Sequence, residues 1–434
     1  MPVAIAGLIR HAGTAFAVMA IHACGPEQNR DVSLDLNTDT ESTTQGTHFM
    51  RCTYCVLLFT TLFLGTAMAA TPDAEGFVPM FNGQDLSGWV LTNTPSATWT
   101  FQDNMLVCSG KPIGELRTER MYQNFVMELE WRHMVPRGNA GVFIWADDIT
   151  ARGVPFHRGI EVQVLENAYG NTQSHTTHGD IFPIHGATMT PINGRGGSRA
   201  FPTEERSNPS PEWNHYRITC QDGEISLAVN GKVVTQGKEC SPRKGYICLE
   251  SEGGIVHYRN VRIKELPDTP VDAAHVAIAS RGYRSIYSGL DLAGWTGKED
   301  SLNAWHANDW VLSCDGPQNR SDVTLETAEQ FGDVGFVFDV RLKEDGKSLQ
   351  FGLRDAAIDT SDAAISTHLE QTGRWNRFEG TLQGSRLSLT VNGREAFQNR
   401  AVEKLAERGA ISISPSGPIE LANIYVRELS ATIK

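Results

Sequence analysis

Three features are missing from this 434-residue sequence, and each absence excludes a class of protein. Lysine and arginine form no cluster and the formal net charge is −13, so the chain is not suited to binding the phosphates of a nucleic acid. No apolar run is long enough for a comfortable membrane span, which argues against a stable transmembrane anchor. No stretch shows the apolar repeat of an amphipathic helix over three turns, so a helical fold is not expected.

The one clear apolar run lies near the N-terminus. A basic residue precedes an apolar core at 56–64, and the small-residue sequence AMA follows at 67–69, as in a cleaved secretory signal. Met50 stands directly before this pattern. We therefore expect residues 1–49 to be a non-native extension, residues 50–69 to be the signal peptide, and the mature protein to be periplasmic or extracellular.

Cysteine is scarce, and its placement leaves alternatives open. A lipoprotein-like signal ending at Cys24 is an alternative to the later signal, although His22 fits that pattern poorly. Cys240 and Cys248 flank a probable hairpin and could pair in an oxidising compartment. Buried free thiols are the alternative. The spacing of the cysteines matches no zinc motif.

Three long segments of the sequence recur later in the chain. The matching pairs are 81–89 with 287–295, 212–234 with 374–396, and 260–266 with 423–429. A repeat of this length indicates one domain used twice rather than a short solenoid unit. A proline-containing polar stretch separates the copies. We predict modules at 74–267 and 282–430, joined by a linker at 268–281.

Within each copy the sequence alternates as β-strands do. In the segment 125–132 every second residue is apolar, so Glu128, Glu130 and Arg132 share the opposite face. The segment 225–234 reads as a strand, an Asn-Gly turn and a second strand, which is the strongest short signal for a hairpin. Many short strands separated by turns predict an all-β protein of two tandem β-sandwich or jelly-roll modules.

The second copy is reduced. The interval from Phe336 to Trp375 is less than half as long as the matching interval from Phe125 to Trp213. The piece that it lacks corresponds to the stretch with GIEVQVLEN at 159–167 and several histidines. Loops added to a shared scaffold are where binding and catalysis usually lie. The sequence therefore predicts chemistry in the first module and a non-catalytic second module.

Five segments of the first copy together resemble one known family. They are FVPMFNGQDLSGW (77–89), GNAGVFI (138–144), GIEVQVLEN (159–167), HGDIFPI (178–184) and the EWNHYRI…VNG stretch (212–231). The first copy is similar to the 3-keto-disaccharide hydrolase domain family. This resemblance implies a concanavalin-like jelly roll with a concave sugar-binding face, and cleavage of glycosides already oxidised to a ketone at C3. The second copy matches only the framework.

Two polar residues in the GIEVQVLEN segment are the first candidates for the site. Val162 and Val164 point to the core, so Glu161 and Gln163 share the other face of the strand. Glu166 reaches that face only if a β-bulge intervenes near the strand end. A solvated sheet face is the alternative interpretation. We expect Glu161 and Gln163 to line a cleft.

Several other polar and aromatic residues are candidates for binding substrate. Arg132 would pair with a carboxylate and hold a sugar oxygen if its strand neighbours that of Asn139, with Glu130 on the same face. A structural ion pair is the alternative. Trp145 and Trp213 could stack on sugar rings if exposed. A core position is the alternative, and the recurrence of Trp213 in the second copy favours it there.

Four histidines are concentrated in one loop region of the first copy. They are His157, His175, His178 and His185. Such a density permits a divalent metal site with nearby carboxylates, although the spacing fits no standard metal motif. Loop histidines in solvent are the alternative. His178 opens the family-like segment HGDIFPI, and a histidine can move protons at neutral pH.

The chemistry implied by the resemblance assigns roles to these residues. A ketone at C3 acidifies the proton at C2, so a base removes it and the C1 substituent leaves. Glu161 or His178 would be the base, and Arg132, Asn139 or a metal ion would stabilise the enolate. Direct hydrolysis by Glu161 and Glu166 is the alternative mechanism. A non-catalytic carbohydrate-binding protein is the alternative function, since one fold serves both roles.

Overall fold

A computed structural model describes most of the chain. The described residues are 71–169, 178–280, 282–318, 322–354 and 356–429. The predicted N-terminal extension and signal peptide, the alternative signal at Cys24, and His175 lie outside these ranges. Within the described ranges, no helix is both long enough and apolar enough to cross a membrane.

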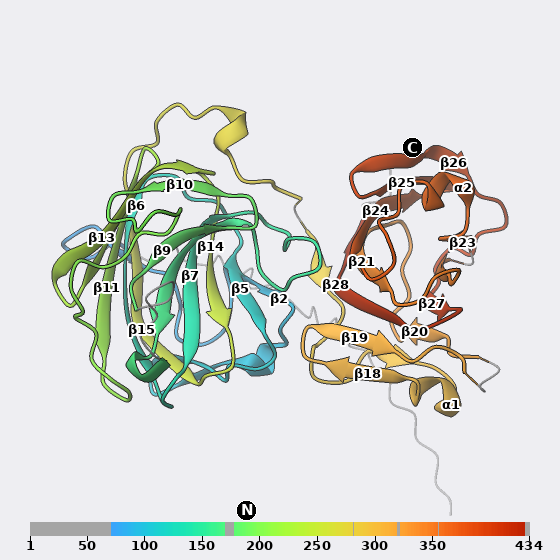
Figure 1. Ribbon diagram of the computed structural model, residues 1–434, viewed down its shortest axis with the longest axis horizontal. Helices are drawn as coiled ribbons and strands as arrows, with labels where there is room; N and C mark the ends of the chain where they lie inside the picture. The colour runs from blue at the N-terminus through green and yellow to red at the C-terminus, as the bar shows by residue number, and fades with distance from the viewer. Residues whose placement is uncertain (1–70, 170–177, 281, 319–321, 355, 430–434) are drawn as a thin grey trace, which may run out of the picture. The chain divides into compact units, whose positions relative to one another are not determined.

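The first pair of sheets, coloured blue to yellow in Figure 1, is formed by strands between Val78 and Glu265. Its nine-stranded antiparallel sheet has the order β10-β13-β12-β11-β6-β15-β4-β3, and β1 pairs with β15. Its six-stranded sheet has the order β2-β5-β14-β7-β8-β9. The bounds are β1 Val78–Pro79, β2 Trp89–Thr92, β3 Trp99–Gln102, β4 Met105–Cys108, β5 Gly114–Thr118, β6 Phe125–His133, β7 Asn139–Ala146, β8 Gly159–Leu165, β9 Ile181–Ile184, β10 Thr188–Pro191, β11 Asn214–Gln221, β12 Glu224–Val229, β13 Lys232–Ser241, β14 Tyr246–Ser251 and β15 Val256–Glu265.

The second pair of sheets, orange to red in Figure 1, is formed by strands between Arg284 and Glu428. Its eight-stranded sheet has the order β18-β19-β28-β21-β24-β25-β26, with β16 beside β28, and its five-stranded sheet has the order β17-β20-β27-β22-β23. The bounds are β16 Arg284–Ser285, β17 Trp295–Thr296, β18 Trp305–Asn308, β19 Val311–Cys314, β20 Leu325–Thr327, β21 Val334–Leu342, β22 Leu349–Leu353, β23 Ala356–Asp359, β24 Asn376–Gln383, β25 Arg386–Val391, β26 Arg394–Ala401, β27 Ile411–Pro415 and β28 Ile419–Glu428. Two short helices, α1 (Glu299–Leu302) and α2 (Ala363–Ser366), lie between strands.

The two pairs of sheets share one strand order. The five-stranded sheet repeats the first five strands of the six-stranded sheet, and the eight-stranded sheet repeats the nine-stranded sheet without β10. Among the described residues, β9 and β10 have no counterpart in the second pair, and this is where the sequence interval is shorter. The predicted all-β, jelly-roll fold class is confirmed. The module limits 74–267 and 282–430 stay predictions.

Alternation along the strands explains how the six-stranded sheet faces its core. One residue from each of the strands β5, β14, β7, β8 and β9 occupies a single register row, and all five side chains are apolar and completely buried. The members of this row are Leu116, Leu249, Val142, Val162 and Ile181. The residues before and after them in each strand therefore point to the opposite face of the sheet.

The predicted hairpin is confirmed as β12 and β13. Asn230 and Gly231 connect the two strands, and both have positive φ, 46° and 86°. A type I′ turn requires positive φ at both central positions, which asparagine and glycine tolerate best. The local sequence was therefore sufficient to predict this element.

The five cysteines within the described ranges are all buried, and none of them forms a disulfide. Cys240 lies on β13 of the nine-stranded sheet, whereas Cys248 lies on β14 of the six-stranded sheet. The pairing considered from the sequence does not form, because Cys240 packs in the core between the sheets and Cys248 points to the opposite face of the six-stranded sheet. The alternative of buried free thiols is the one that the structure shows.

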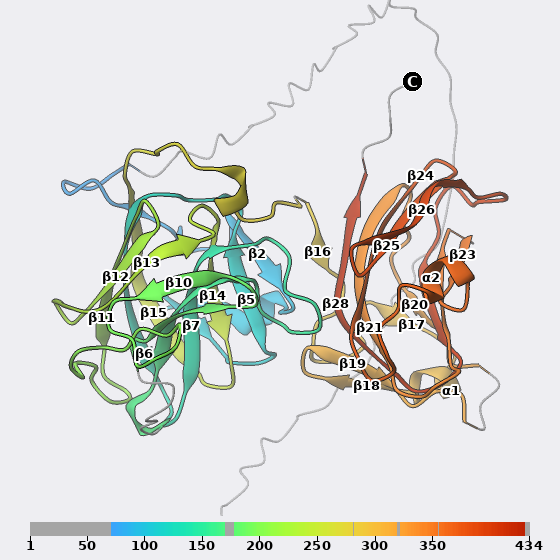
Figure 2. The same cartoon turned by 45° about the horizontal axis from the view of Figure 1, so that its top comes forward.

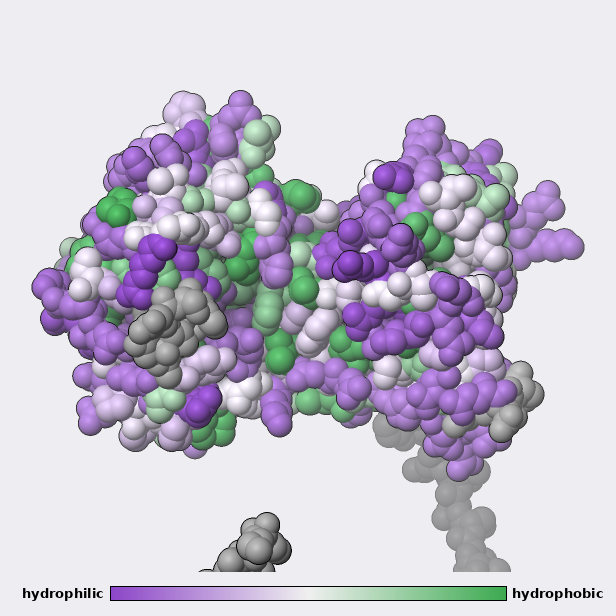
Figure 3. Space-filling model, in the orientation of Figure 1, coloured by the Kyte–Doolittle hydropathy of each residue, from purple (hydrophilic) through white to green (hydrophobic). Residues whose placement is uncertain are grey.

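The described residues all belong to one compact unit. The chain between the two pairs of sheets is bound to the first pair: the backbone N–H of Arg243 donates to the carbonyl of His275 at 2.8 Å. The N–H of Ala277 donates to the carbonyl of Lys244 at 2.7 Å. On the face shown in Figure 3 the surface is mostly hydrophilic, with apolar residues in small groups.

Candidate active site

A row of polar residues follows the face of the six-stranded sheet that is turned away from the core. Glu115 of β5 is the register partner of Glu250 of β14, and Gly141 of β7 is the partner of Gln163 of β8. Glu161 lies two residues before Gln163 and on the same face. The side chains of Glu115, Glu250, Glu161 and Gln163 are all buried, and that of Glu161 is 7% exposed. The sequence-based assignment of Glu161 and Gln163 to one non-core face agrees with this geometry.

Gly141 allows two carboxylates to converge. A Cβ atom at this position would lie 2.9 Å from Glu161 Oε1 and 3.0 Å from Glu250 Oε2. Any side chain there would push the two acids aside, so the glycine keeps both of them above β7. Glu250 Oε2 is buried and has no hydrogen-bond partner among the described residues. An unpartnered buried carboxylate oxygen is costly, and a ligand in this place would satisfy it.

Amide side chains connect the rest of the cluster. Gln163 Nε2 donates a hydrogen bond to Asn139 Oδ1 at 2.7 Å, and Asn139 Nδ2 donates to Glu252 Oε2. Glu252 is in turn hydrogen-bonded to Glu250. The structure thus brings together Glu161, Gln163 and Asn139, which the sequence had singled out, with two glutamates that it had not.

Burial changes the acidity of these glutamates. It raises the pKa of Glu161 well above its usual value, the charge of Glu252 adds to this effect, and the charge of Arg199 opposes it. Burial also raises the pKa of Glu250 well above its usual value, and the charge of Glu161 adds to it. The pKa of Glu252 is raised by burial as well. The cluster therefore retains protons at pH values where exposed carboxyls lose them, so it can provide an acid and a base together.

One arginine lies beside the acids. Arg199 Nη1 is 3.1 Å from Asp180 Oδ2, and its guanidinium stacks 3.4 Å from the centre of the Phe182 ring. Asp180 is completely buried just before β9. Arg199 belongs to the loop between β10 and β11, and it lies beside the acids where the sequence analysis had expected Arg132.

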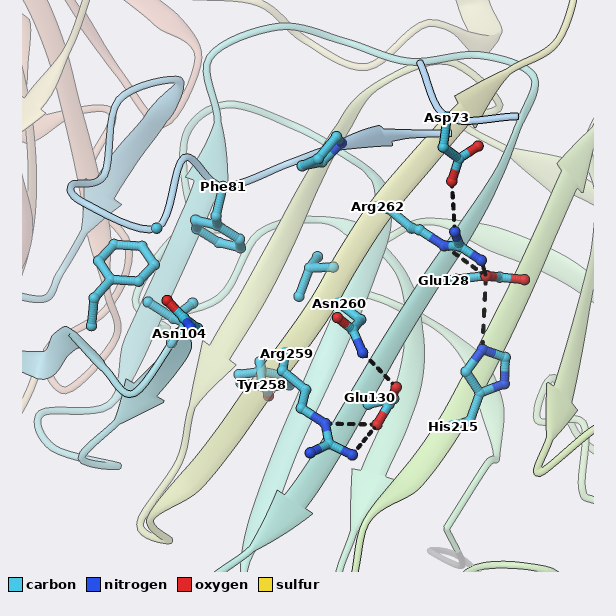
Figure 4. Close-up of a pocket in the computed structure, with 15 residues that line it drawn as sticks. Asp73, Phe81, Asn104, Glu128, Glu130, His215, Tyr258, Arg259, Asn260 and Arg262 are labelled. Atoms are coloured by element: carbon cyan, nitrogen blue, oxygen red, sulfur yellow. Dashed lines mark hydrogen bonds and ion pairs between the residues drawn. The ribbon is translucent and has the colours of Figure 1, made fainter. Parts of the chain in front are cut away.

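The structure does not bring Arg132 and Glu130 to the acidic cluster. Both lie on β6 of the nine-stranded sheet, on its outer face, so the core separates them from Glu161. The condition that β6 and β7 are neighbours in one sheet is not met. Glu130 pairs with Arg259 at 2.6 Å in a hollow of about 580 Å³, shown in Figure 4. The Arg132 guanidinium stacks 4.5 Å from the Trp213 ring, which is partly exposed rather than part of the core.

Glu166 and Trp145 both form hydrogen bonds with backbone groups of the protein. The register of β8 with β7 is unbroken, so the bulge that would turn Glu166 to the cleft is not present. Instead Glu166 accepts hydrogen bonds from the backbone N–H groups of Arg137 at 2.7 Å and Ala168 at 2.8 Å. Although burial acts to raise it, these donors hold the pKa of Glu166 below its usual value. Trp145 is completely buried and donates its indole N–H to the Gln123 carbonyl, so it offers no surface to a sugar.

The histidines divide between two places. His178 is 7% exposed just before β9, and its Nε2 has no hydrogen-bond partner among the described residues. Burial lowers the pKa of His178, against the charges of nearby Glu205, Asp180 and Glu166. It is therefore neutral at pH 7 and able to accept a proton. His157 is completely buried and belongs to a different group of side chains.

Three buried side chains could hold a metal ion. One ligand atom each from Glu115, His157 and Cys248 lie within 4.8 Å of one another. Oxygen, imidazole nitrogen and thiolate sulfur together suit a transition metal such as zinc. The sequence spacing gave no sign of this group, because its members come from β5, the β7–β8 loop and β14. Its donor atoms fit the divalent metal considered from the sequence.

The second pair of sheets lacks the acids. The register row of Leu325, Ile413, Phe351 and Ile358 matches the core row of the first pair. The residues that correspond to Glu115, Glu250 and Glu161 are then Thr324, Ser414 and Ala357. Thr324 Oγ1 and Ser414 Oγ are hydrogen-bonded at 2.8 Å, where the first pair has two glutamates.

The sequence analysis missed Glu250, although a signal for it was present. In the segment 246–251, Ile247 and Leu249 point to the core, so Glu250 faces the other way for the same reason as Glu161. Arg199 carried no such signal. It reaches the cluster from a loop, and a loop residue's position does not follow from strand periodicity.

These features define the class: a jelly-roll β-sandwich, the architecture of many glucanases and lectins, with a buried acidic cluster on one sheet. Residues 76–264 match the family model described as a 3-keto-alpha-glucoside-1,2-lyase-like domain. The resemblance read from the sequence is confirmed over this span, and it supports a carbohydrate-acting function. No curated protein matches the chain.

Solved structures with a similar fold include carbohydrate-acting and carbohydrate-binding proteins. A candidate glycosyl hydrolase from Parabacteroides distasonis is 23% identical, with a TM-score of 0.35, and the match covers 45% of this chain and 95% of that one. A carbohydrate-binding module from Bacillus subtilis is 11% identical, with a TM-score of 0.29 and coverage of 41% and 96%. A Bacillus licheniformis β-glucanase is 13% identical, with a TM-score of 0.28 and coverage of 42% and 94%.

Proposed function

We propose that this protein is an exported enzyme that cleaves 3-keto-glycosides or 3-keto-disaccharides between C1 and the glycosidic oxygen. The family match over residues 76–264 supports the substrate class. The observation that carries the proposal is the convergence of Glu161 and Glu250 above Gly141, on a buried face where their pKa values are raised. Such a pair supplies a base and an acid at one place.

The proposed reaction begins at C2 of the oxidised sugar. The ketone at C3 acidifies the C2 proton, the Glu161 carboxylate takes that proton, and an enolate forms. The enolate electrons then form the C1–C2 double bond while the C1–O bond breaks, and a protonated carboxyl such as Glu250 gives its proton to the leaving oxygen. In hydrolysis, water subsequently adds across this double bond. His178 is a second candidate for the base.

Positive charge near the acids assists this reaction. Arg199 lies close enough to Glu161 for its charge to lower the pKa of that carboxyl. A fixed guanidinium in a buried site stabilises negative charge that develops on an enolate oxygen. A divalent ion bound by Glu115, His157 and Cys248 would supply a Lewis acid to the same sheet face.

The test is to incubate the purified mature chain with a 3-keto-glucoside and to measure the released alcohol or sugar. An enzyme gives catalytic turnover, and detection of the C1–C2 unsaturated ketose distinguishes elimination from direct hydrolysis. A carbohydrate-binding protein gives saturable binding and no product. Mass spectrometry of the native protein tests export, because cleavage after the signal leaves an N-terminus near Ala70.

A further inference from the structure

The loop of residues 147–158 connects β7 to β8 and reaches from the first pair of sheets to the second. Its tip, residues 150–154, lies against the outer face of the eight-stranded sheet, where β21, β24 and β28 are neighbours in Figures 1 and 2. The other end of the loop carries His157, which contacts the acidic face of the six-stranded sheet. One short segment therefore touches both the second pair of sheets and the candidate site.

A buried charge pair receives the loop tip. The backbone N–H of Gly153 donates to Asp339 Oδ2 at 2.8 Å. Asp339 of β21 is completely buried, and Arg377 of β24 donates to both of its oxygens at 2.7 Å. A buried carboxylate is tolerated only when its hydrogen-bonding capacity is used, and the loop supplies one of these donors.

Asn423 of β28 holds the backbone of the same tip. Its Nδ2 donates to the carbonyls of Ala151 at 3.1 Å and Val154 at 2.9 Å, while its Oδ1 accepts from Asn93 Nδ2 at 2.8 Å. Asn423 is 1% exposed. Recognition of backbone groups by a buried side chain fixes the path of the loop and not only its location.

A hydroxyl pair completes the contact. Thr150 Oγ1 and Tyr425 OH are hydrogen-bonded at 2.9 Å, and Thr150 has no exposed surface.

Gly153 leaves no room for a side chain at this contact. Its φ is +72°, and a Cβ atom would lie 2.3 Å from Cδ1 of the Trp375 indole. The indole ring is rigid and cannot move aside as a flexible chain end does. The close approach of loop and sheet therefore depends on a glycine at this position.

The opposite end of the loop is joined to the acids. The backbone N–H of His157 donates to Glu115 Oε2 at 3.1 Å, and the imidazole Nδ1 of His157 contacts the same oxygen. Glu115 is the register partner of Glu250. Movement of the loop tip would thus displace the Glu115 side chain, which lies next to the proposed acid Glu250.

The corresponding face of the first pair of sheets is built differently. Glu130 and Asn260 occupy the register positions of Asp339 and Asn423, and the two asparagines share positive φ values of 50° and 52° at the same bulge. In the first pair this face is the open hollow of Figure 4, where Glu130 bonds to Arg259 and Asn260. The second pair has used the equivalent positions to bind a loop.

We infer that the second pair of sheets acts as a clamp, whose outer face holds the 147–158 loop and so positions His157 against Glu115. Asp339, Asn423 and Tyr425 are positioning residues in this arrangement, because they act on the site through the loop. The effect of the clamp on turnover rests on the proposed function, whereas the clamp itself does not.

The variant Gly153→Ala in the full chain tests the clamp. The matched control is Gly231→Ala, because Gly231 also has positive φ, +86°, but an added Cβ there meets nothing within 4 Å. Hydrogen exchange of the 147–158 peptide should become about tenfold faster or more in Gly153→Ala and stay unchanged in the control. Turnover of a 3-keto-glucoside should fall by about 10²-fold at nearly constant KM, as when a catalytic group is displaced.

The outcomes separate the two hypotheses. If wild-type protein turns over no 3-keto-glucoside, the proposed function fails, and the exchange measurement still decides on the clamp. Unchanged exchange of the 147–158 peptide in Gly153→Ala overturns the clamp. Faster exchange with unchanged kcat in an active enzyme overturns the link from the clamp to His157 and Glu115.

Discussion

Glu161 combines deep burial with the position that the proposed base requires. From the sequence alone, desolvation and a cationic neighbour act on its pKa in opposite directions, and the balance was open. In the structure burial dominates over Arg199, so the pKa is raised. A carboxylate with raised pKa is a stronger base than an exposed one, which suits removal of a carbon-bound proton.

Substitution of Glu161 by Gln tests this role. The variant keeps the shape of the side chain and removes its basicity, so turnover of a 3-keto-glucoside should fall by about 10² to 10⁴-fold. Glu130→Gln is the matched control, because Glu130 lies on the outer face of the other sheet. Steady-state kinetics and circular dichroism compare the two variants. Near-normal turnover in Glu161→Gln would transfer the role to Glu250 or His178.

The convergence of Glu161 and Glu250 depends on the absence of a side chain at Gly141. Gly141→Ala places a methyl group within 3.0 Å of Glu250 Oε2 and closer still to Glu161 Oε1, so the acids must separate. We expect turnover to fall by about tenfold or more, as it does when catalytic groups are misplaced. Gly332→Ala serves as the control, because its added Cβ meets its nearest atom at 3.4 Å. Equal activities of the two variants would contradict the convergence of the acids.

The raised pKa values also predict how stability depends on pH. Burial raises the folded-state pKa of Glu250 above its ordinary 4.5, so its favourable contribution is complete below that pH and is lost as the pH rises through the folded pKa. Glu250→Gln should therefore gain stability over the wild type as the pH increases above 4.5. Urea unfolding between pH 4 and pH 8 measures this difference.

Glu128 provides the opposite sign as a control. Burial acts to raise its pKa, but hydrogen bonds from Arg262 and Arg217 hold it below the usual value. The stabilising contribution of the Glu128 carboxylate is present above pH 4.5 and is lost as the pH falls through its folded-state pKa. Glu128→Gln should therefore be less stable than the wild type at neutral pH. If the two variants shift in the same direction, the assigned environments are wrong.

At the scale of elements, strand periodicity predicted which face of a sheet a side chain occupies, but it did not predict which side chains hold the loops. The alternation in β8 placed Glu161 and Gln163 on one face, and the structure agrees. The same reasoning could not place Glu166, because it follows the last residue of the strand. There the side chain binds backbone groups of three separate loop segments, at Arg137, Ala168 and Ser210.

Glu166→Ala should therefore loosen loops rather than remove chemistry. Three partly buried backbone N–H groups lose their acceptor, and we expect the free energy of unfolding to fall by about 1 to 3 kcal/mol. Limited proteolysis near Ser210 should accelerate, while the residual folded enzyme keeps its KM. A loss of kcat comparable to that of Glu161→Gln, with stability unchanged, would instead support the two-carboxylate mechanism.

At the scale of the whole molecule, the two pairs of sheets differ at the register positions of the acidic cluster, and we propose that turnover belongs to the first pair alone. Thr324 and Ser414 stand at the register positions of Glu115 and Glu250 in the second pair. The double variant Thr324→Ala/Ser414→Ala in the full chain should leave turnover of a 3-keto-glucoside within about twofold of wild type. The two hydroxyl groups stand where the first pair has carboxyls, and they supply neither an acid nor a base to the proposed reaction. A large loss of kcat in this variant, with the fold intact, would place a second active site there.

The sequence by itself determined the all-β fold, the Asn-Gly hairpin and the face on which Glu161 and Gln163 lie. These follow from short-range rules, because side-chain direction alternates along a strand and turn geometry depends on neighbouring residues. Only the tertiary structure decided that Glu250 and Arg199 join Glu161, that Arg132 does not, and that Gly153 lies against Trp375. Which strands become neighbours, and where a loop folds back, depends on contacts between residues far apart in the chain, and no local pattern encodes them.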